Sequence, residues 1–68
     1  MYKVSKRNLG VAKLNAGVKS DKDLALLAGV SVNTISRINN GGRATLATLG
    51  RIAKALGVDP AELLKEEV

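Results

Sequence analysis

Cysteine and histidine are both absent from the 68-residue chain, and Tyr2 is its only aromatic residue. These absences exclude disulfides, thiolate and imidazole metal ligands, and the histidine general base that operates near neutral pH. No apolar run approaches the roughly 18 residues of a membrane span, and no signal-like apolar segment follows the basic start of the chain. We therefore expect a cytoplasmic protein that uses no metal or cofactor and is stabilised by packing alone.

The apolar residues are almost all small and aliphatic. They make up 46% of the chain and consist of Ala, Val, Leu and Ile apart from Met1 and Tyr2. Such side chains favour helices in close contact. A chain this short has room for one core, because a domain of about 60 residues buries only about 60% of the surface that its unfolded chain exposes. The composition predicts one all-α domain over residues 1–68.

The charged residues are unevenly distributed along the chain. Residues 1–54 contain ten of the eleven Lys and Arg but only two of the six Asp and Glu, which gives them a formal charge of +8. Residues 55–68 carry a formal charge of −3. A basic body of this kind is typical of a polyanion-binding surface, and equally of an ordinary solvated one. Charge alone leaves both interpretations open.

Glycines and capping residues divide the chain into five predicted helices. Glycines that follow a stretch of helical spacing, as residues just past a helix C-terminus do, are Gly17, Gly29, Gly41 with Gly42, and Gly57. Polar residues that can cap the start of each helix are Ser5, Ser20, Ser31, Thr45 and Asp59. The predicted helices cover about residues 6–16, 21–28, 32–39, 46–56 and 60–66, and no segment has the pattern of a strand.

Apolar residues at three- and four-residue steps indicate the face of each helix that meets the core. They are Leu24 with Leu27, Ile35 with Ile38, and Leu46, Leu49, Ile52, Ala53 and Leu56. Gly10 and Gly50 fall inside predicted helices. Each costs about 1 kcal/mol relative to Ala unless close packing uses the missing side chain.

Residues 20–41 have the spacing of a helix-turn-helix, in which two helices of about eight residues are joined by a tight turn. Ala25 is small enough for the third predicted helix to cross the second closely. Gly29 can take the positive φ that the turn needs, Val30 fills the space between the helices, and Ser31 caps the next one. The segment therefore predicts a helix-turn-helix whose second helix spans residues 32–39.

This segment resembles the lambda-repressor and Cro type of helix-turn-helix protein, the family also called XRE-like. The matching residues are Leu24-Ala25, Gly29-Val30-Ser31, Thr34 to Ile38, Asn40-Gly41, Thr45-Leu46, Leu49, Ile52-Ala53, Ala55-Leu56, Val58 and Leu63. The resemblance covers about residues 5–64. It implies a compact five-helix domain that regulates transcription, as a repressor, by placing its third helix in the major groove of double-stranded DNA.

The resemblance also implies which side chains meet DNA. Those on or beside the third helix are Ser31, Val32, Asn33, Ser36, Arg37 and Asn40, of which Val32, Asn33 and Arg37 fall where the family contacts base edges. Their chemistry pairs Arg37 with guanine, Asn33 with adenine and Val32 with a thymine methyl group. Lys22 and Arg43 are predicted phosphate contacts at the edges of the groove.

Three positions depart from the family pattern. Asp21 stands where a Gln commonly contacts a phosphate, and its carboxylate suits the helix dipole but would repel DNA. We therefore expect Asp21→Gln to tighten DNA binding. Asn39 stands where a Glu commonly precedes Asn-Gly, so we expect the family's internal ion pair with an Arg on the first helix to be missing. Val32 replaces a commonly polar residue.

The sequence bears on two other function classes, an enzyme and a protein-interaction module. An enzyme with a small-molecule substrate is not expected, because a domain of this size has no room for a deep pocket and its acid-base groups are limited to Asp, Glu, Lys and Tyr2. The stronger alternative is a protein-interaction module, such as an antitoxin component, which Asp21 and the acidic end favour.

We expect a homodimer on a palindromic operator. The residues that would supply a small apolar dimer surface are Val58, Leu63, Leu64 and Val68. The same residues would serve equally well to close the core of the monomer, and the sequence leaves both possibilities open.

Overall fold

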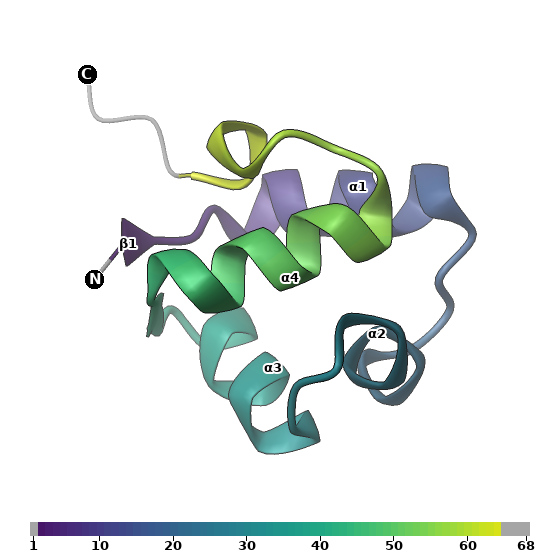
Figure 1. Cartoon of the computed structure of the whole chain (residues 1–68), viewed down its shortest axis with the longest axis horizontal. Coiled ribbons are helices and arrows are strands. Elements are labelled where there is room, and N and C mark those ends of the chain that lie inside the picture. The colour runs from purple at the N-terminus through teal and green to yellow at the C-terminus, as the bar shows by residue number, and fades with distance from the viewer. Residues whose placement is uncertain (1, 65–68) are drawn as a thin grey trace.

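The computed structural model describes residues 2–64 of the chain (Figure 1). Its elements are β1 (Tyr2–Lys3), α1 (Lys6–Ala16), α2 (Asp21–Ala28), α3 (Val32–Asn39), β2 (Arg43–Ala44), α4 (Leu46–Leu56) and a 3-10 helix, η1 (Pro60–Leu63). The four α-helices have the bounds that the sequence predicts. Within residues 2–64, no helix is long and apolar enough to cross a membrane.

Side-chain caps fix where each α-helix begins. The hydroxyl oxygen of the capping residue accepts a hydrogen bond of 3.1–3.2 Å from the backbone N–H three residues later at Ser5, Ser20, Ser31 and Thr45. Each cap satisfies a backbone donor that the helix leaves unpaired, and is worth about 1 kcal/mol. The predicted starts were correct because they depend on such local contacts.

The expected fifth α-helix over residues 60–66 is wrong. The chain forms a single 3-10 turn at Pro60–Leu63, which begins at the predicted cap Asp59 and carries a capping box of Asp59 and Glu62. The turn ends because the Leu63 carbonyl accepts a hydrogen bond from Ser5 N–H at 2.8 Å, and Leu64 forms an antiparallel bridge with Val4. This pairing with the start of the chain outweighs the local preference for helix. Residues 65 and 66 of the predicted helix lie outside the described residues.

The expectation of a structure without strands is also wrong. β1 pairs with β2 in an antiparallel two-stranded sheet, with Tyr2 opposite Ala44 and Lys3 opposite Arg43. Two-residue strands are too short to show the alternation by which strands are found in a sequence. The protein is therefore mostly helical, with four α-helices and this small sheet in its described part.

The core lies where α4 packs against α2 and the 3-10 turn, with α1 completing it. Its fully buried large side chains are Leu9, Leu24, Ile35, Ile38, Leu49, Ile52 and Leu63. Figure 1 shows α4 crossing the middle of the molecule, with α2 and α3 on one side of it and the 3-10 turn on the other.

Two leucines predicted for the core are exposed instead. Leu27 is 63% exposed and Leu46 is 63% exposed. α2 buries Leu24, Ala25 and Ala28, and this face turns Leu27 toward solvent. Leu46 occupies the first position of α4, one turn before the buried part of that helix.

Neither helical glycine serves close packing. A Cβ built on Gly10 or Gly50 would meet no atom within 4 Å. No close packing therefore offsets the cost of glycine at these two helical positions.

Candidate nucleic-acid interface

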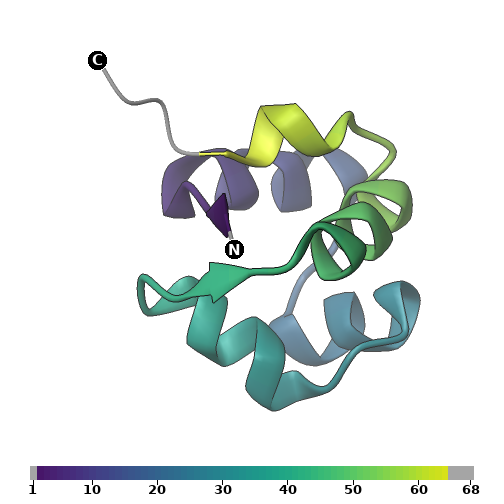
Figure 2. The same cartoon turned by 60° about the vertical axis from the view of Figure 1, so that its left-hand side comes forward.

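α2 and α3 form the predicted helix-turn-helix. Gly29 has a φ of 71°, in the left-handed region that glycine adopts without a steric penalty. This conformation lets the N–H groups of Gly29 and Val30 both donate to the Ala25 carbonyl, at 2.9 and 3.1 Å. Ala25 is buried and Val30 packs against the core. Figure 2 shows α2 and α3 together on the side of the molecule opposite α1 and the 3-10 turn.

α3 has one buried face and one exposed face. Ile35 and Ile38 are buried, as predicted. The exposed side chains include four of the predicted DNA contacts, Val32, Asn33, Ser36 and Arg37. Within residues 2–64, no hydrogen bond or ion pair engages the side chains of Asn33, Ser36 or Arg37. The structure thus brings these residues together on one surface with their polar groups available to a ligand.

Ser31 is exposed at the start of α3 but has internal partners. Its Oγ accepts from Thr34 N–H at 3.1 Å and lies 2.8 Å from Thr34 Oγ1. A serine hydroxyl has one donor and two acceptor positions, so capping α3 leaves Ser31 able to make a further contact.

A tight loop holds the end of α3 next to β2. Asn40 is exposed and caps α3, and Gly42 N–H donates to the Arg37 carbonyl at 2.8 Å. A Cβ on Gly42 would lie 2.5 Å from the Arg37 carbonyl oxygen and 2.9 Å from Arg37 Cγ. The absence of a side chain at Gly42 therefore lets the loop touch Arg37, and it places Arg43, the next residue, at the same end of α3.

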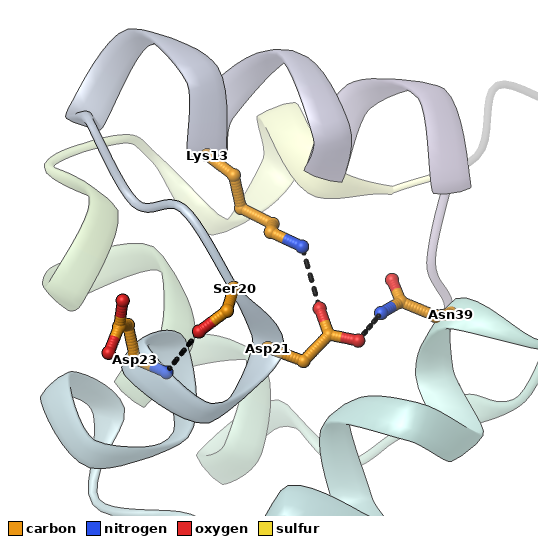
Figure 3. Close-up of polar contacts among 5 residues, drawn as sticks. All are labelled: Lys13, Ser20, Asp21, Asp23 and Asn39. Atoms are coloured by element: carbon orange, nitrogen blue, oxygen red, sulfur yellow. Dashed lines mark hydrogen bonds and ion pairs between the residues drawn. The ribbon is translucent and has the colours of Figure 1, made fainter.

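The start of α2 differs from expectation (Figure 3). Lys22 is exposed, as predicted. The Asp21 carboxylate, however, is engaged inside the protein: Lys13 Nζ donates to its Oδ1 at 2.6 Å, and Asn39 Nδ2 donates to its Oδ2 at 2.7 Å. We call this arrangement the Asp21 tie. Its carboxylate is not an uncompensated negative charge facing a ligand.

The environment of the tie favours the charged form of Asp21. The hydrogen bond from Lys13 is the largest influence and lowers the pKa of this carboxyl below its ordinary value of 3.8. Partial burial opposes that effect, and the Asn39 amide adds to it. The Lys13 and Asp21 side chains are 19% and 36% exposed, so the pair is only partly screened by solvent.

The expected absence concerned the family's ion pair between position 39 and an Arg on the first helix, and the structure does not contradict it. A different internal ion pair is present, which was not foreseen: its carboxylate is Asp21 on α2 and its cation is Lys13 on α1. The sequence did contain a signal of this ion pair. Compared with the family pattern, position 21 gains a carboxylate and position 39 lacks one. Treated one at a time, the two departures did not reveal that the side chains of Asp21 and Asn39 are hydrogen-bonded to each other.

Sequence reasoning also missed Arg51. This exposed residue of α4 places its Nη1 3.6 Å from the position that a Cβ on Gly29 would take. α2 has no basic residue in its own last turn. A cation beside the C-terminus of a helix interacts favourably with the helix dipole, so α4 supplies at the turn the charge that α2 lacks.

The expected dimer surface is mostly used within the monomer. Leu63 is fully buried, and Val58 and Leu64 pack against the core. Val68, the remaining member of that predicted surface, lies outside the described residues.

Comparison with protein families agrees with this geometry. Residues 16–63 match the family model described as Helix-turn-helix. The matched segment runs from the last residue of α1 through α2, the turn, α3 and α4 to the end of the 3-10 turn. No curated protein and no solved structure matches the chain.

Proposed function

Because the chain belongs to the helix-turn-helix family of lambda-repressor (XRE-like) type, we propose that this DNA-binding protein regulates transcription, as a repressor, by placing α3 in the major groove. The observation that carries the proposal is the exposed face of α3. It presents an amide, a hydroxyl and a guanidinium without internal partners among residues 2–64. A helix with such a face fits the major groove, where base edges offer distinct donor and acceptor patterns.

The proposed roles follow from position on α3. Arg37 forms a bidentate contact to guanine, Asn33 contacts adenine, and Val32, which is 47% exposed, packs against a thymine methyl group. Ser31, Ser36 and Asn40 contact phosphates or neighbouring bases. Lys22, which follows Asp21, and Arg43 both lie near the C-terminal end of α3 and hold the phosphate backbone.

We also propose that the protein binds a palindromic operator as a homodimer. α3 has only eight residues, and one such helix contacts few base pairs. Two copies on half-sites about one helical turn apart would double the contacted sequence. Equilibrium sedimentation with and without operator DNA tests this. A monomer at high micromolar concentration under both conditions contradicts it.

The test of DNA binding begins with selection of bound sequences from random duplexes. Mobility-shift titrations then compare the preferred duplex with an unrelated one at several salt concentrations. We expect association at micromolar concentration or tighter that salt weakens. No association at low salt would reject the proposal and favour the alternative of a protein-interaction module or antitoxin component. Asp21 no longer favours that alternative, since its carboxylate is bound internally.

The test of residue roles uses single alanine variants. Arg37→Ala should cost about 1–3 kcal/mol on the preferred site and relax the preference at one base pair. Lys22→Ala and Arg43→Ala should weaken all sequences similarly and reduce the salt-dependence slope by about one unit each. The control is Lys54→Ala, an exposed basic residue in the last turn of α4, which should leave both quantities unchanged. An equal loss on every sequence would make Arg37 a phosphate contact.

A further inference from the structure

We propose that Asp21 is a positioning residue for DNA recognition: its carboxylate ties the end of α3 to α1 and sets the orientation in which α3 meets the major groove. This inference rests on the proposed function. It gives a purpose to Asp21, one of two acidic residues in the first turn of α2 and the one whose carboxylate is bound by other helices.

The Asp21 tie joins three helices through one side chain. Lys13 lies on α1, Asp21 begins α2, and Asn39 is the last residue of α3. Each carboxylate oxygen accepts one hydrogen bond, at 2.6 Å from Lys13 and at 2.7 Å from Asn39. A carboxylate with a separate donor on each oxygen is held in both position and rotation, because movement of either partner breaks a charge-assisted bond.

The tie joins helices that share little direct packing. α3 packs against α2 and β2, and α4 packs against α2, but α1 and α3 share little direct packing. The start of α3 is fixed by the turn at Gly29 and the cap at Ser31. Its end is connected to α1 through the Asp21 tie, two residues after Arg37. The Gly42 loop and the buried Ile38 also hold this end of α3, so loss of the tie leaves α3 packed but removes its polar link to α1 and changes the orientation of the turn that carries the proposed guanine contact.

The same geometry explains how an acidic residue is tolerated beside DNA. Lys13 compensates the Asp21 charge, and both oxygens are directed at internal donors (Figure 3). Asp21 therefore does not take the place of a phosphate contact. Its effect on DNA passes through Asn39 and the orientation of α3.

The experiment compares three variants of the full chain. Asp21→Asn removes the charge partner of Lys13. Asn39→Asp places a second carboxylate against Asp21. The double variant Asp21→Asn with Asn39→Asp exchanges the acid and the amide and keeps both side-chain lengths. The amide at position 21 can then accept from Lys13 with its oxygen and donate to the carboxylate at position 39 with its nitrogen. Asp59→Ala, which removes the cap of the distant 3-10 turn, is the control for general loss of stability.

The measured quantity is the ratio of affinities for the preferred duplex and an unrelated duplex, at a temperature where each variant is folded. We expect each single variant to lower this ratio about tenfold, the double variant to restore it to within about threefold, and Asp59→Ala to leave it unchanged. A ratio unchanged in Asp21→Asn, or tighter binding of that variant to every duplex, would overturn the proposal.

A second measurement does not depend on DNA. Residual dipolar couplings of backbone amides in the free protein report the orientation of α3 relative to α1. We expect a change in Asp21→Asn and its reversal in the double variant. An unchanged orientation overturns the positioning role even if DNA binds. A changed orientation in a protein that binds no DNA would retain the tie and reject the proposed function instead.

Discussion

Replacing Gly42 by Ala tests whether the loop after α3 is held as tightly as its geometry indicates. The added Cβ would lie 2.5 Å from the Arg37 carbonyl oxygen and 2.9 Å from Arg37 Cγ. The oxygen belongs to the backbone of α3 and cannot rotate away. The loop must therefore move, and the 2.8 Å hydrogen bond from Gly42 N–H to that oxygen is strained or lost.

The expected magnitude combines three effects. Overpacking costs about 1–3 kcal/mol, and loss of one hydrogen bond costs about 0.5–1.5 kcal/mol. The reduced entropy of the unfolded chain returns about 0.4–1 kcal/mol. We therefore expect Gly42→Ala to lower the free energy of unfolding by about 2 kcal/mol, which corresponds to a fall in Tm of roughly 8–16 °C for a domain of this size.

Gly10→Ala and Gly50→Ala are matched controls with the opposite expected sign. A Cβ at either position meets no atom within 4 Å, so each change should raise the free energy of unfolding by about 0.5–1 kcal/mol. Urea denaturation of the three variants measures all the differences. If Gly42→Ala were as stable as the wild-type protein, the loop would be free to move and the close contact with Arg37 would have no energetic consequence.

Three further predictions concern charge and packing. The pKa of Asp21 is lowered in the folded protein, so the stability that its carboxylate contributes is complete above the unfolded-state pKa and is lost as pH falls through the folded-state pKa. Between about pH 5 and pH 2, the free energy of unfolding from urea titrations should therefore fall more in the wild-type protein than in Asp21→Asn. Parallel curves for the two proteins would contradict this. Leu24→Ala should cost about 2–5 kcal/mol and Leu27→Ala less than about 0.5 kcal/mol, and similar losses in thermal denaturation would contradict the observed exposure of Leu27. Arg51→Met should cost about 0.3–1 kcal/mol at low salt and much less at 1 M salt, so a loss that salt does not reduce would exclude an interaction with the end of α2.

Signals within a few residues of each other predicted most of the fold. Ser20 and Gly29 enclose α2 because the cap and the left-handed glycine act on backbone groups of that same helix. The exposed face of α3 follows from the spacing of Ile35 and Ile38 for the same reason. The arrangement of the candidate site on α3 could therefore be predicted, since its side chains share one helix.

Contacts between distant parts of the chain could not be predicted in this way. The 3-10 turn ends where Leu64 meets Val4, sixty residues earlier in the sequence. The Asp21 tie depends on three helices meeting at one carboxylate. No local pattern encodes such meetings, because they depend on how the helices pack.

The pairing of β1 with β2 has a practical consequence for spectroscopy. Tyr2 is the only aromatic residue in the chain, so tyrosine emission arises from a single position. That position lies opposite Ala44 in the sheet, beside Arg43, and its side chain is 44% exposed. The protein thus carries one intrinsic fluorophore next to the loop that follows α3. Its emission should report the arrival of a polyanion at that end of the molecule without any attached dye.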